Sequence, residues 1–228
     1  MKKSILFSVL VVGATLLQAQ SITVHQTCGQ NGQVLVIETN GHECVDLGLP
    51  SGTLWATCNV GATTPEDYGN YYAWGETTTK STYNWSTYFH TNDGGSTFSK
   101  YNEGGKTVLD PEDDAAHVNW GGSWHMPTKA EWQELLDNCT WTWTTQNGIN
   151  GYKVTSNKAG YTDKFIFLPA AGYRNGSGLY DVGSVGFYWS SSLDVSRENR
   201  AWYFRSDDRD LAARYYRNYG RSVRPVLP

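Results

Sequence analysis

The chain has 228 residues, a formal net charge of −4 and a charged fraction of 18%. This acidic balance argues against a general nucleic-acid-binding protein, which needs a strongly basic surface. The length suits one large domain with its own hydrophobic core. Ten Trp, fifteen Tyr, seven Phe and 24 Gly are typical of folds in which large rings fill the core between irregular loops.

Residues 1–19 have the pattern of a secretory signal peptide. Lys2 and Lys3 precede an apolar run over residues 5–17, and Ala19 stands before the polar chain. The run is too short to span a bilayer comfortably, and no later run reaches membrane length. We therefore expect an exported protein without a transmembrane segment, located outside the cell, at its surface or in the periplasm.

The N-terminal part of the mature chain predicts an extension over residues 20–41 and a main domain over residues 42–228. Residues 33–39 alternate apolar and polar side chains, and Asn40-Gly41 follows as a turn, which predicts a strand entering a hairpin. Residues 47–60 predict a turn and then a strand.

Two further segments precede the main helix. Thr64-Pro65-Glu66-Asp67 predicts the start of a short helix, because Thr64 is a good cap and Pro65 suits the first helical position. Residues 75–108 are polar and rich in Thr, Ser, Gly and Tyr, which predicts a long surface loop with little regular structure.

The clearest helix is expected from Thr128 to Asn138. Thr128 and Glu131 have the spacing of a capping box. Trp132, Leu135 and Leu136 then recur at helical spacing and form one apolar face.

The segment after this helix predicts short strands over residues 141–145, 152–155, 165–168, 187–191, 201–205 and 222–226. One good helix followed by many strands favours an α+β fold over alternating β-α-β units.

Four cysteines lie beyond the signal peptide: Cys28, Cys44, Cys58 and Cys139. An even number in an exported protein suggests disulfides. We favour the pairs Cys28–Cys44 and Cys58–Cys139; the alternative is buried free thiols that pack as small apolar groups.

Positive charge is segregated along the chain. All nine arginines lie between Arg174 and Arg224, and all nine lysines lie at or before Lys164. Between residues 194 and 221 the arginines alternate with Tyr, Trp, Asn, Ser and Asp, which are residue types common in binding hot spots and antibody paratopes. The C-terminal quarter is therefore interpreted as a recognition surface, the alternative being an ordinary solvated face.

Several motifs carry a family resemblance. GSWHMPTKAEWQEL (122–135) and GRSVRPV (220–226) are similar to the main helix and closing strand of the formylglycine-generating, C-type-lectin-like fold. More closely, the chain resembles the Fibrobacter succinogenes major paralogous domain family, which is common in Bacteroidetes. The motifs that carry this resemblance are VDLGLPSGTLWATCNVGA (45–62), YAWGET (72–77), PEDDAA (111–116), LPAAGYR (168–174) and YWSSS (188–192).

The resemblance implies an α+β, C-type-lectin-like fold with one clear helix, short strands and long loops. Variable proteins of diversity-generating retroelements also use this fold and mutate adenines of AAC-type codons in their C-terminal segment. Such codons cannot reach Lys, Glu, Gln, Met or Trp. Between Leu193 and Tyr219, only Glu198 and Trp202 are outside the reachable set, which accounts for arginine without lysine.

The predicted function is binding of a protein or other macromolecule at a diversified surface over residues 194–221. A carbohydrate-binding surface protein and a structural or adhesion subunit are the alternatives. Arg217, Gly220, Ser222, Val223 and Arg224 match the family pattern and are assigned to the scaffold. The expected ligand-binding residues are Asp194, Arg197, Asn199, Arg200, Tyr203, Arg205, Asp207, Asp208, Arg209, Asp210, Arg214, Tyr215, Tyr216, Asn218 and Tyr219.

No enzyme, metal or cofactor is expected. The related oxidase activity needs cysteines in the C-terminal part of the domain, and here the last cysteine is Cys139. HExxH, GxSxG, Walker and GxGxxG motifs are absent. The acidic residues around Pro111 fit either a calcium site or a helix cap. Trp141 and Trp143 share one strand face, which fits either sugar stacking or core packing.

Overall fold

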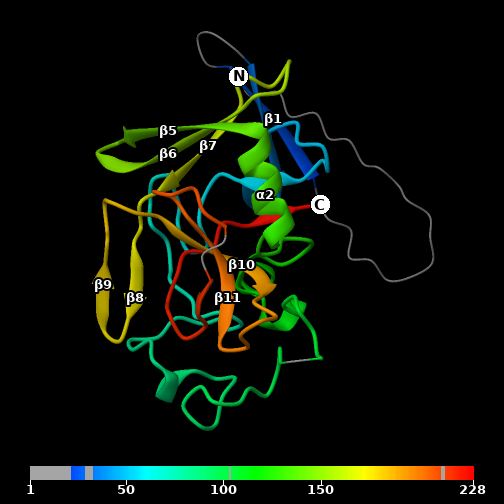
Figure 1. Cartoon of the computed structure of the whole chain (residues 1–228). Helices are drawn as coiled ribbons and strands as arrows, with labels where there is room; N and C mark the ends of the chain where they lie inside the picture. The colour runs from blue at the N-terminus through cyan, green and yellow to red at the C-terminus, as the bar shows by residue number, and fades with distance from the viewer. Residues whose placement is uncertain (1–21, 29–32, 103, 212–213) are drawn as a thin grey trace, which may run out of the picture.

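A computed structural model describes residues 22–28, 33–102, 104–211 and 214–228, with side chains from Glu38 onward. The predicted signal peptide lies outside the described residues. The described part is mixed α and β, with strands dominating and few helices (Figure 1). This agrees with the α+β prediction at the level of class. None of the helices in this part is long and apolar enough to cross a membrane.

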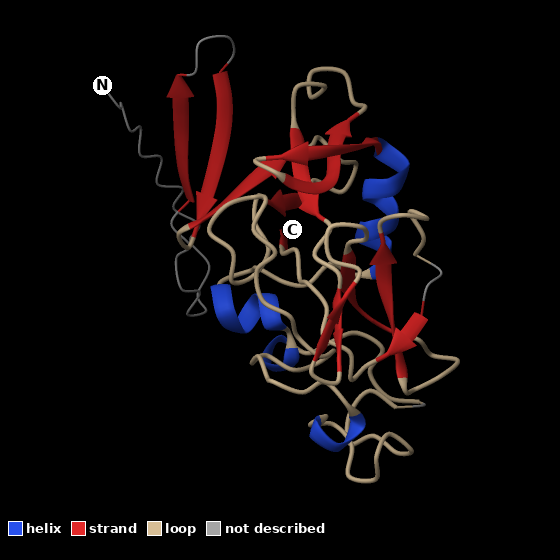
Figure 2. Cartoon of the chain, turned by 90° about the vertical axis from the view of Figure 1, so that its left-hand side faces the viewer, coloured by secondary structure: helices blue, strands red, loops and turns tan. Residues whose placement is uncertain are grey.

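The N-terminal strands and the last strand form one antiparallel sheet, in the order β1-β2-β3-β4-β13. The strands are β1 Ile22–Cys28, β2 Gln33–Thr39, β3 His42–Asp46, β4 Leu54–Ala56 and β13 Val226–Leu227. Strand β2 has the bounds that its alternating pattern predicts. Asn40 and Gly41 both adopt positive φ, as a tight hairpin turn between β2 and β3 requires. The β1–β2 hairpin extends away from the rest of the molecule (Figure 2).

Helix α2 (Lys129–Asn138) begins where the sequence predicts. The Thr128 hydroxyl accepts a hydrogen bond from the Glu131 N–H, and the Glu131 carboxylate accepts one from the Thr128 N–H. The capping box is therefore confirmed. The Trp132 indole is fully buried and stacks on Phe204, with 4.8 Å between ring centroids.

The strands after α2 form three antiparallel groups (Figure 1). They are β5 Cys139–Gln146 with β6 Ile149–Ser156 and β7 Phe165–Pro169; β8 Tyr173–Asn175 with β9 Gly178–Tyr180; and β10 Phe187–Leu193 with β11 Arg200–Arg205 and β12 Arg214–Tyr216. Five of the six predicted strands fall within β5, β6, β7, β10 and β11. Strands β8, β9 and β12 have three residues each, too few to show an alternating pattern.

Strands β10 and β11 lie between two parts of the hydrophobic core. Trp189 and Tyr203 are cross-strand partners and belong to one buried cluster, whereas Tyr188 and Phe204 are partners in the other. Side chains of a strand alternate between its two faces, so this sheet is covered on both sides. The rigid position of β11 follows from this double burial.

Long irregular segments make up much of the remainder. Among the described residues of 75–108, the only helical element is the 3-10 turn η1 (Trp85–Thr87). Two local predictions are corrected, and one helix was not predicted. Residues 64–67 form a turn without a helix. The strand expected over residues 222–226 is reduced to β13, because Ser222 makes only an isolated bridge with Tyr188. The sequence also missed helix α1 (Ala115–Trp120), which follows the 3-10 turn η2 (Pro111–Asp113).

The expected disulfides do not form. Cys58 and Cys139 are both free thiols; Cys58 follows β4 at a half-buried position, whereas Cys139 is enclosed in the core at the end of α2. For the other pair, Cys44 is opposite Ile37, which is opposite Val24 in β1. Cys28 is four residues further along β1, a displacement of about 13 Å at 3.3 Å per residue. That is more than a disulfide spans.

Candidate binding surface

The C-terminal segment places most of the predicted ligand-binding side chains at the surface. It runs through β11, a turn and β12, and three of its predicted contact residues are nevertheless buried: Asp194, Tyr203 and Asn218 are only 2%, 6% and 3% exposed. The others are exposed or half-buried: Arg197, Asn199, Arg200, Arg205, Asp207, Asp208, Arg209, Asp210, Arg214, Tyr215, Tyr216 and Tyr219.

Two of these buried residues, Tyr203 and Asp194, contact other parts of the fold and are not available to a ligand. Tyr203 points from β11 into the core, because it is opposite Trp189 on the covered face of the sheet. The Asp194 carboxylate accepts hydrogen bonds from the Ser196 N–H and hydroxyl and lies 3.4 Å from the Arg214 guanidinium. The sequence pattern alone could not separate these residues from their exposed neighbours.

Two exposed arginines are held by neighbouring carboxylates. Arg205 pairs with Asp207 at 2.6 Å and with Asp208 at 3.0 Å, and Arg214 pairs with Asp194. Exposed ion pairs contribute little to stability because water screens them. They do hold the two guanidinium groups in defined directions.

A continuous row of aromatic side chains lies on this side of the molecule. In order along the row, ring centroids are separated by 5.5, 5.8, 4.9, 5.4 and 5.8 Å. Tyr180 is 47% exposed and Tyr215 is 39% exposed, and the other four are partly buried. We call this row the tyrosine platform: Tyr180, Tyr173, Tyr219, Tyr215, Tyr216 and Trp85.

The platform joins three regions of the chain. Tyr173 and Tyr180 come from the β8–β9 hairpin, and Trp85 comes from the long loop before α1. These three residues were not among those predicted from the sequence. The Asn-Gly-Ser-Gly stretch over residues 175–178 is a hairpin signal that brings Tyr173 and Tyr180 opposite each other; nothing in the sequence links Trp85 to them.

Three arginines of the C-terminal segment are fully buried. Arg217 donates to the carbonyls of Lys100 and Tyr101. Arg224 donates to the carbonyls of Ala56, Thr57 and Phe167 and to the side chain of Asn59. Both guanidinium groups therefore have acceptors that offset much of the cost of burying their charge.

Arg221 is satisfied differently. It is 2% exposed, and its Nε and Nη1 atoms have no hydrogen-bond partner among the described residues. Its guanidinium lies 3.6 Å from the ring centroid of Tyr203, 4.8 Å from Trp189 and 5.6 Å from Tyr215. Burial lowers the pKa of Arg221 to about 10, so the group stays positively charged at neutral pH. Cation–π contacts stabilise the group although these two atoms lack hydrogen bonds.

A shallow hollow of about 370 Å³ lies between α2 and β11, next to the C-terminal segment. Trp202 lines it, with Lys129 Nζ 3.6 Å from its ring centroid and the Arg214 guanidinium carbon at 4.8 Å. Because cations contact the ring, Trp202 is a poor platform for stacking a sugar. Arg209 and Asp210 also line the hollow.

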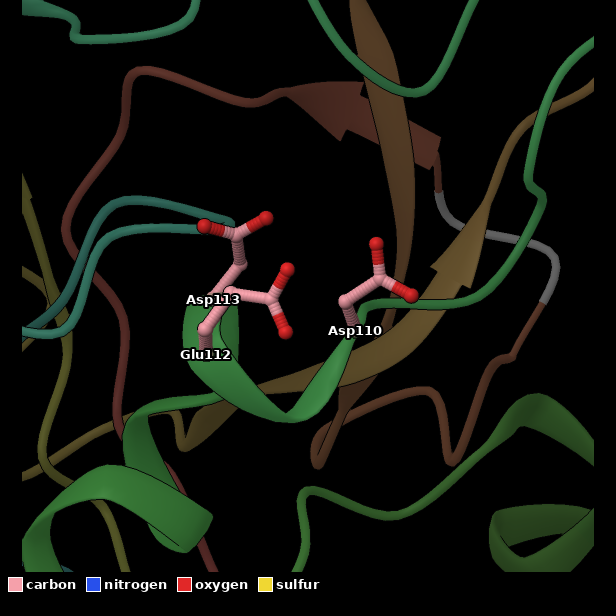
Figure 3. A group of neighbouring side chains, drawn as sticks. All are labelled: Asp110, Glu112 and Asp113. Atoms are coloured by element: carbon pink, nitrogen blue, oxygen red, sulfur yellow. The ribbon is translucent and has the colours of Figure 1, made fainter.

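The acidic residues around Pro111 form the cluster that the sequence predicted as a calcium site or a cap. Carboxylate oxygens of Asp110, Glu112 and Asp113 lie within 4.8 Å of one another (Figure 3). The Lys100 ammonium lies 2.8 Å from Asp113 and 3.1 Å from Glu112, and hydrogen bonds to these two carboxylates raise the pKa of Lys100. A divalent cation would have to displace this ammonium group.

The cap is made by the next acidic residue. The Asp114 carboxylate accepts hydrogen bonds from the Ala116 and His117 N–H groups at the start of α1 and from the Met126 N–H. The helix-cap interpretation is confirmed for this residue.

The two tryptophans of β5 lie on one face, as predicted, since both contact Tyr152. Trp141 packs against Phe204 at 4.9 Å and belongs to the core side. Trp143 is 44% exposed. Only the second ring is therefore accessible for stacking against a ligand.

The C-terminal segment, the β8–β9 hairpin and the loop that carries Trp85 thus build one aromatic and cationic surface from residues far apart in the sequence. Comparison with known proteins gives no relative from which to take a ligand: no family model, curated protein or solved structure matches the chain.

Proposed function

We propose that this protein is an exported, non-enzymatic binding protein of the C-type-lectin-like fold that recognises a protein ligand through the tyrosine platform and the exposed arginines of residues 194–221. The platform is the observation that carries the proposal. Tyr and Arg dominate binding hot spots because they supply large rigid contact area and planar hydrogen-bonding groups. Six neighbouring rings, two of them more than a third exposed, offer such an area.

The scaffold beneath the surface supports this role. Strands β10 and β11 are covered on both faces by core residues, so the residues between β11 and β13 are presented on a rigid base. Substitutions at exposed positions usually change stability by less than about 0.5 kcal/mol. Such a base tolerates variation at the surface, as the resemblance to retroelement variable proteins requires. Pairing of β13 with β4 also suits the closing strand of the family.

The test is a quantitative pull-down from the native environment with a double variant, Arg205→Ala with Tyr215→Ala. We expect it to melt like the wild type and to lose its partner, because truncation of hot-spot residues costs about 2 kcal/mol or more in binding. Phe165→Ala is the matched control, since Phe165 is 40% exposed and Tyr215 39%, but Phe165 lies on β7. Unchanged capture by the double variant would remove the platform as the binding site.

A second candidate is binding of a glycan at Trp143. Its 44% exposed ring is the observation that favours this function, since exposed indoles stack on sugar rings. A Trp143→Ala variant that loses the partner, while the Arg205→Ala and Tyr215→Ala variant keeps it, would favour the glycan candidate over the platform.

A further inference from the structure

The tyrosine platform has a positive charge directly beneath it. Arg221 contacts the Tyr215 ring at 5.6 Å and the Tyr173 ring at 5.7 Å, and both tyrosines belong to the platform. Tyr215 is 39% exposed although it reaches the buried guanidinium. The platform rings therefore separate this charge from solvent by about one side chain.

No carboxylate of the described residues forms an ion pair with Arg221. The other two buried arginines differ in degree. The Nη atoms of Arg217 and Arg224 donate to backbone carbonyls and only Nε of Arg217 lacks an acceptor, whereas both Nε and Nη1 of Arg221 have none in the described part of the chain. A buried cation without a counter-charge produces a strong local field, since the surrounding rings screen it poorly. The fold thus leaves the Arg221 charge without an ion pair under the tyrosine platform.

The hydroxyl groups of the platform are suited to meet an anion. Burial and the neighbouring Tyr215 raise the pKa of Tyr219 to about 12, while the Arg221 charge opposes that shift. The Tyr219 hydroxyl consequently stays protonated at neutral pH. The Tyr215 and Tyr219 rings lie 4.9 Å apart, and each hydroxyl has one proton that it can donate to an external acceptor.

Charged groups of both signs lie near the platform. The Arg200 guanidinium lies 5.1 Å from the Tyr216 ring, and its Nε atom has no partner among the described residues. Arg214 is paired with Asp194. Asp181 acts on the Tyr173 hydroxyl from the other end of the platform, and Glu198 acts on Arg217. Arg221 forms no ion pair with a described residue.

The ring geometry favours a peptide over a sugar as the bearer of the anion. Tyr173 stacks on Tyr219 with 7° between ring planes and on Tyr180 with 26°, so faces of these rings are already covered. Tyr215 meets Tyr216 at 70° and Tyr219 at 58°. Sugars bind to open ring faces, whereas edges and hydroxyls of tyrosines suit the mixed polar and apolar contacts of a peptide.

We propose that the tyrosine platform binds an acidic segment of a protein ligand and places a carboxylate of that segment at the Tyr215 and Tyr219 hydroxyls, over Arg221. This inference rests on the proposed function and names the chemistry of its ligand. The carboxylate supplies the counter-charge that Arg221 lacks within the described part of its own chain. A segment without a carboxylate gains only the aromatic contacts.

The probe is acetyl-hexaglutamate amide, titrated calorimetrically into the full mature chain, with acetyl-hexaglutamine amide as the neutral control and trigalacturonate as a carboxylate on a glycan. We expect hexaglutamate to bind about tenfold more tightly than hexaglutamine, the factor that one charge-assisted hydrogen bond supplies. The preference should shrink as salt is added. Equal binding of the two peptides, or tighter binding of trigalacturonate, would overturn the proposal.

The Tyr215→Phe and Tyr219→Phe double variant keeps the rings and removes the hydroxyls. We expect its affinity for hexaglutamate to fall about tenfold, with unchanged melting temperature and unchanged affinity for hexaglutamine. Tyr161→Phe, outside the platform, is the matched control. Arg221→Met removes the charge and should abolish the preference for hexaglutamate over hexaglutamine. If that variant does not fold, the Tyr215→Phe and Tyr219→Phe double variant tests the proposal alone.

The two proposals fail in different ways. If the Arg205→Ala and Tyr215→Ala variant loses its native partner while hexaglutamate is not preferred, the surface is correct and the carboxylate is wrong. If partner capture is unchanged and hexaglutamate is not preferred, both proposals are wrong.

Discussion

Arginines of one short C-terminal segment have opposite roles that depend on their burial. Arg217, Arg221 and Arg224 are enclosed in the core, whereas Arg197 and Arg209 are exposed. A buried guanidinium stabilises the fold only when its donors find acceptors or ring faces. Arg224 has four acceptors on two segments, residues 56–59 and Phe167, and therefore ties the closing strand to β4 and β7.

At this position we expect a large effect on stability. Arg224→Ala should reduce the free energy of unfolding by more than about 3 kcal/mol, because it leaves several buried carbonyls without donors. Arg197→Ala should change it by less than about 0.5 kcal/mol, since Arg197 is exposed. Urea denaturation of both variants checks the ranking, and similar midpoints for the two would contradict the structural role of Arg224.

His125 and Glu131 form a pH-dependent contact, with 3.0 Å between His125 Nε2 and Glu131 Oε1. Burial lowers the pKa of His125, but the hydrogen bond and charge of Glu131 outweigh it, and the net pKa is raised above 6.5. The contact should therefore stabilise the fold fully below pH 6.5 and be lost as the pH rises through the raised pKa of the folded state.

The measurement compares wild type and His125→Gln by urea denaturation across this range. We expect the difference in free energy of unfolding to be largest below pH 6.5 and to shrink at higher pH. Glu131 has a folded pKa below 4.5 despite its burial, because His125 and Thr128 hold its charged form, so the difference should also shrink as the pH falls through that lowered pKa. A pH-independent difference would show that the pair is not charged in the folded protein.

Helix α2 has both a defined N-terminal cap and a defined buried face. Its cap and its buried face can be tested separately. Thr128→Ala removes the capping hydrogen bond and should cost about 1 kcal/mol, whereas Trp132→Ala opens a cavity between Phe204 and Trp55 and should cost about 3–5 kcal/mol. Urea denaturation that ranks Thr128→Ala as the more damaging change would show that the core does not depend on this face of α2.

The β8–β9 hairpin shows how a short element can position part of a binding surface. Gly172 precedes it with φ +67°, and a Cβ atom there would lie 2.0 Å from the Tyr180 carbonyl oxygen. Only glycine permits this close approach. The approach brings Tyr173 and Tyr180 into the stacked pair that forms one end of the platform.

For the whole molecule, the core holds the described part together without disulfides between its cysteines. Burial raises the pKa of the Cys139 thiol to about 12, and the thiolate is the reactive form. We therefore expect iodoacetamide to modify Cys58 in the native protein and Cys139 only after unfolding, as measured by peptide mass spectrometry. A Cys58–Cys139 linked peptide in the non-reduced protein would contradict the structure.

The sequence by itself determined the features that depend on neighbouring residues. The capping box, the apolar face of α2 and the alternating pattern of β2 act within a few residues, so α2 and β2 were predicted with correct bounds. The segregation of arginine from lysine also predicted which segment carries the exposed arginines.

Tertiary structure decided what depends on distant partners. Arg221 and Arg209 look alike in sequence, and only packing buries the first under tyrosines and leaves the second exposed. Trp85 joins the platform because a long irregular loop passes next to β12, and no local pattern records that approach. The predictions of a helix at residues 64–67 and of two disulfides were wrong for the same reason. Side-chain preferences permit several local conformations and cysteine pairings, and burial and strand register select among them.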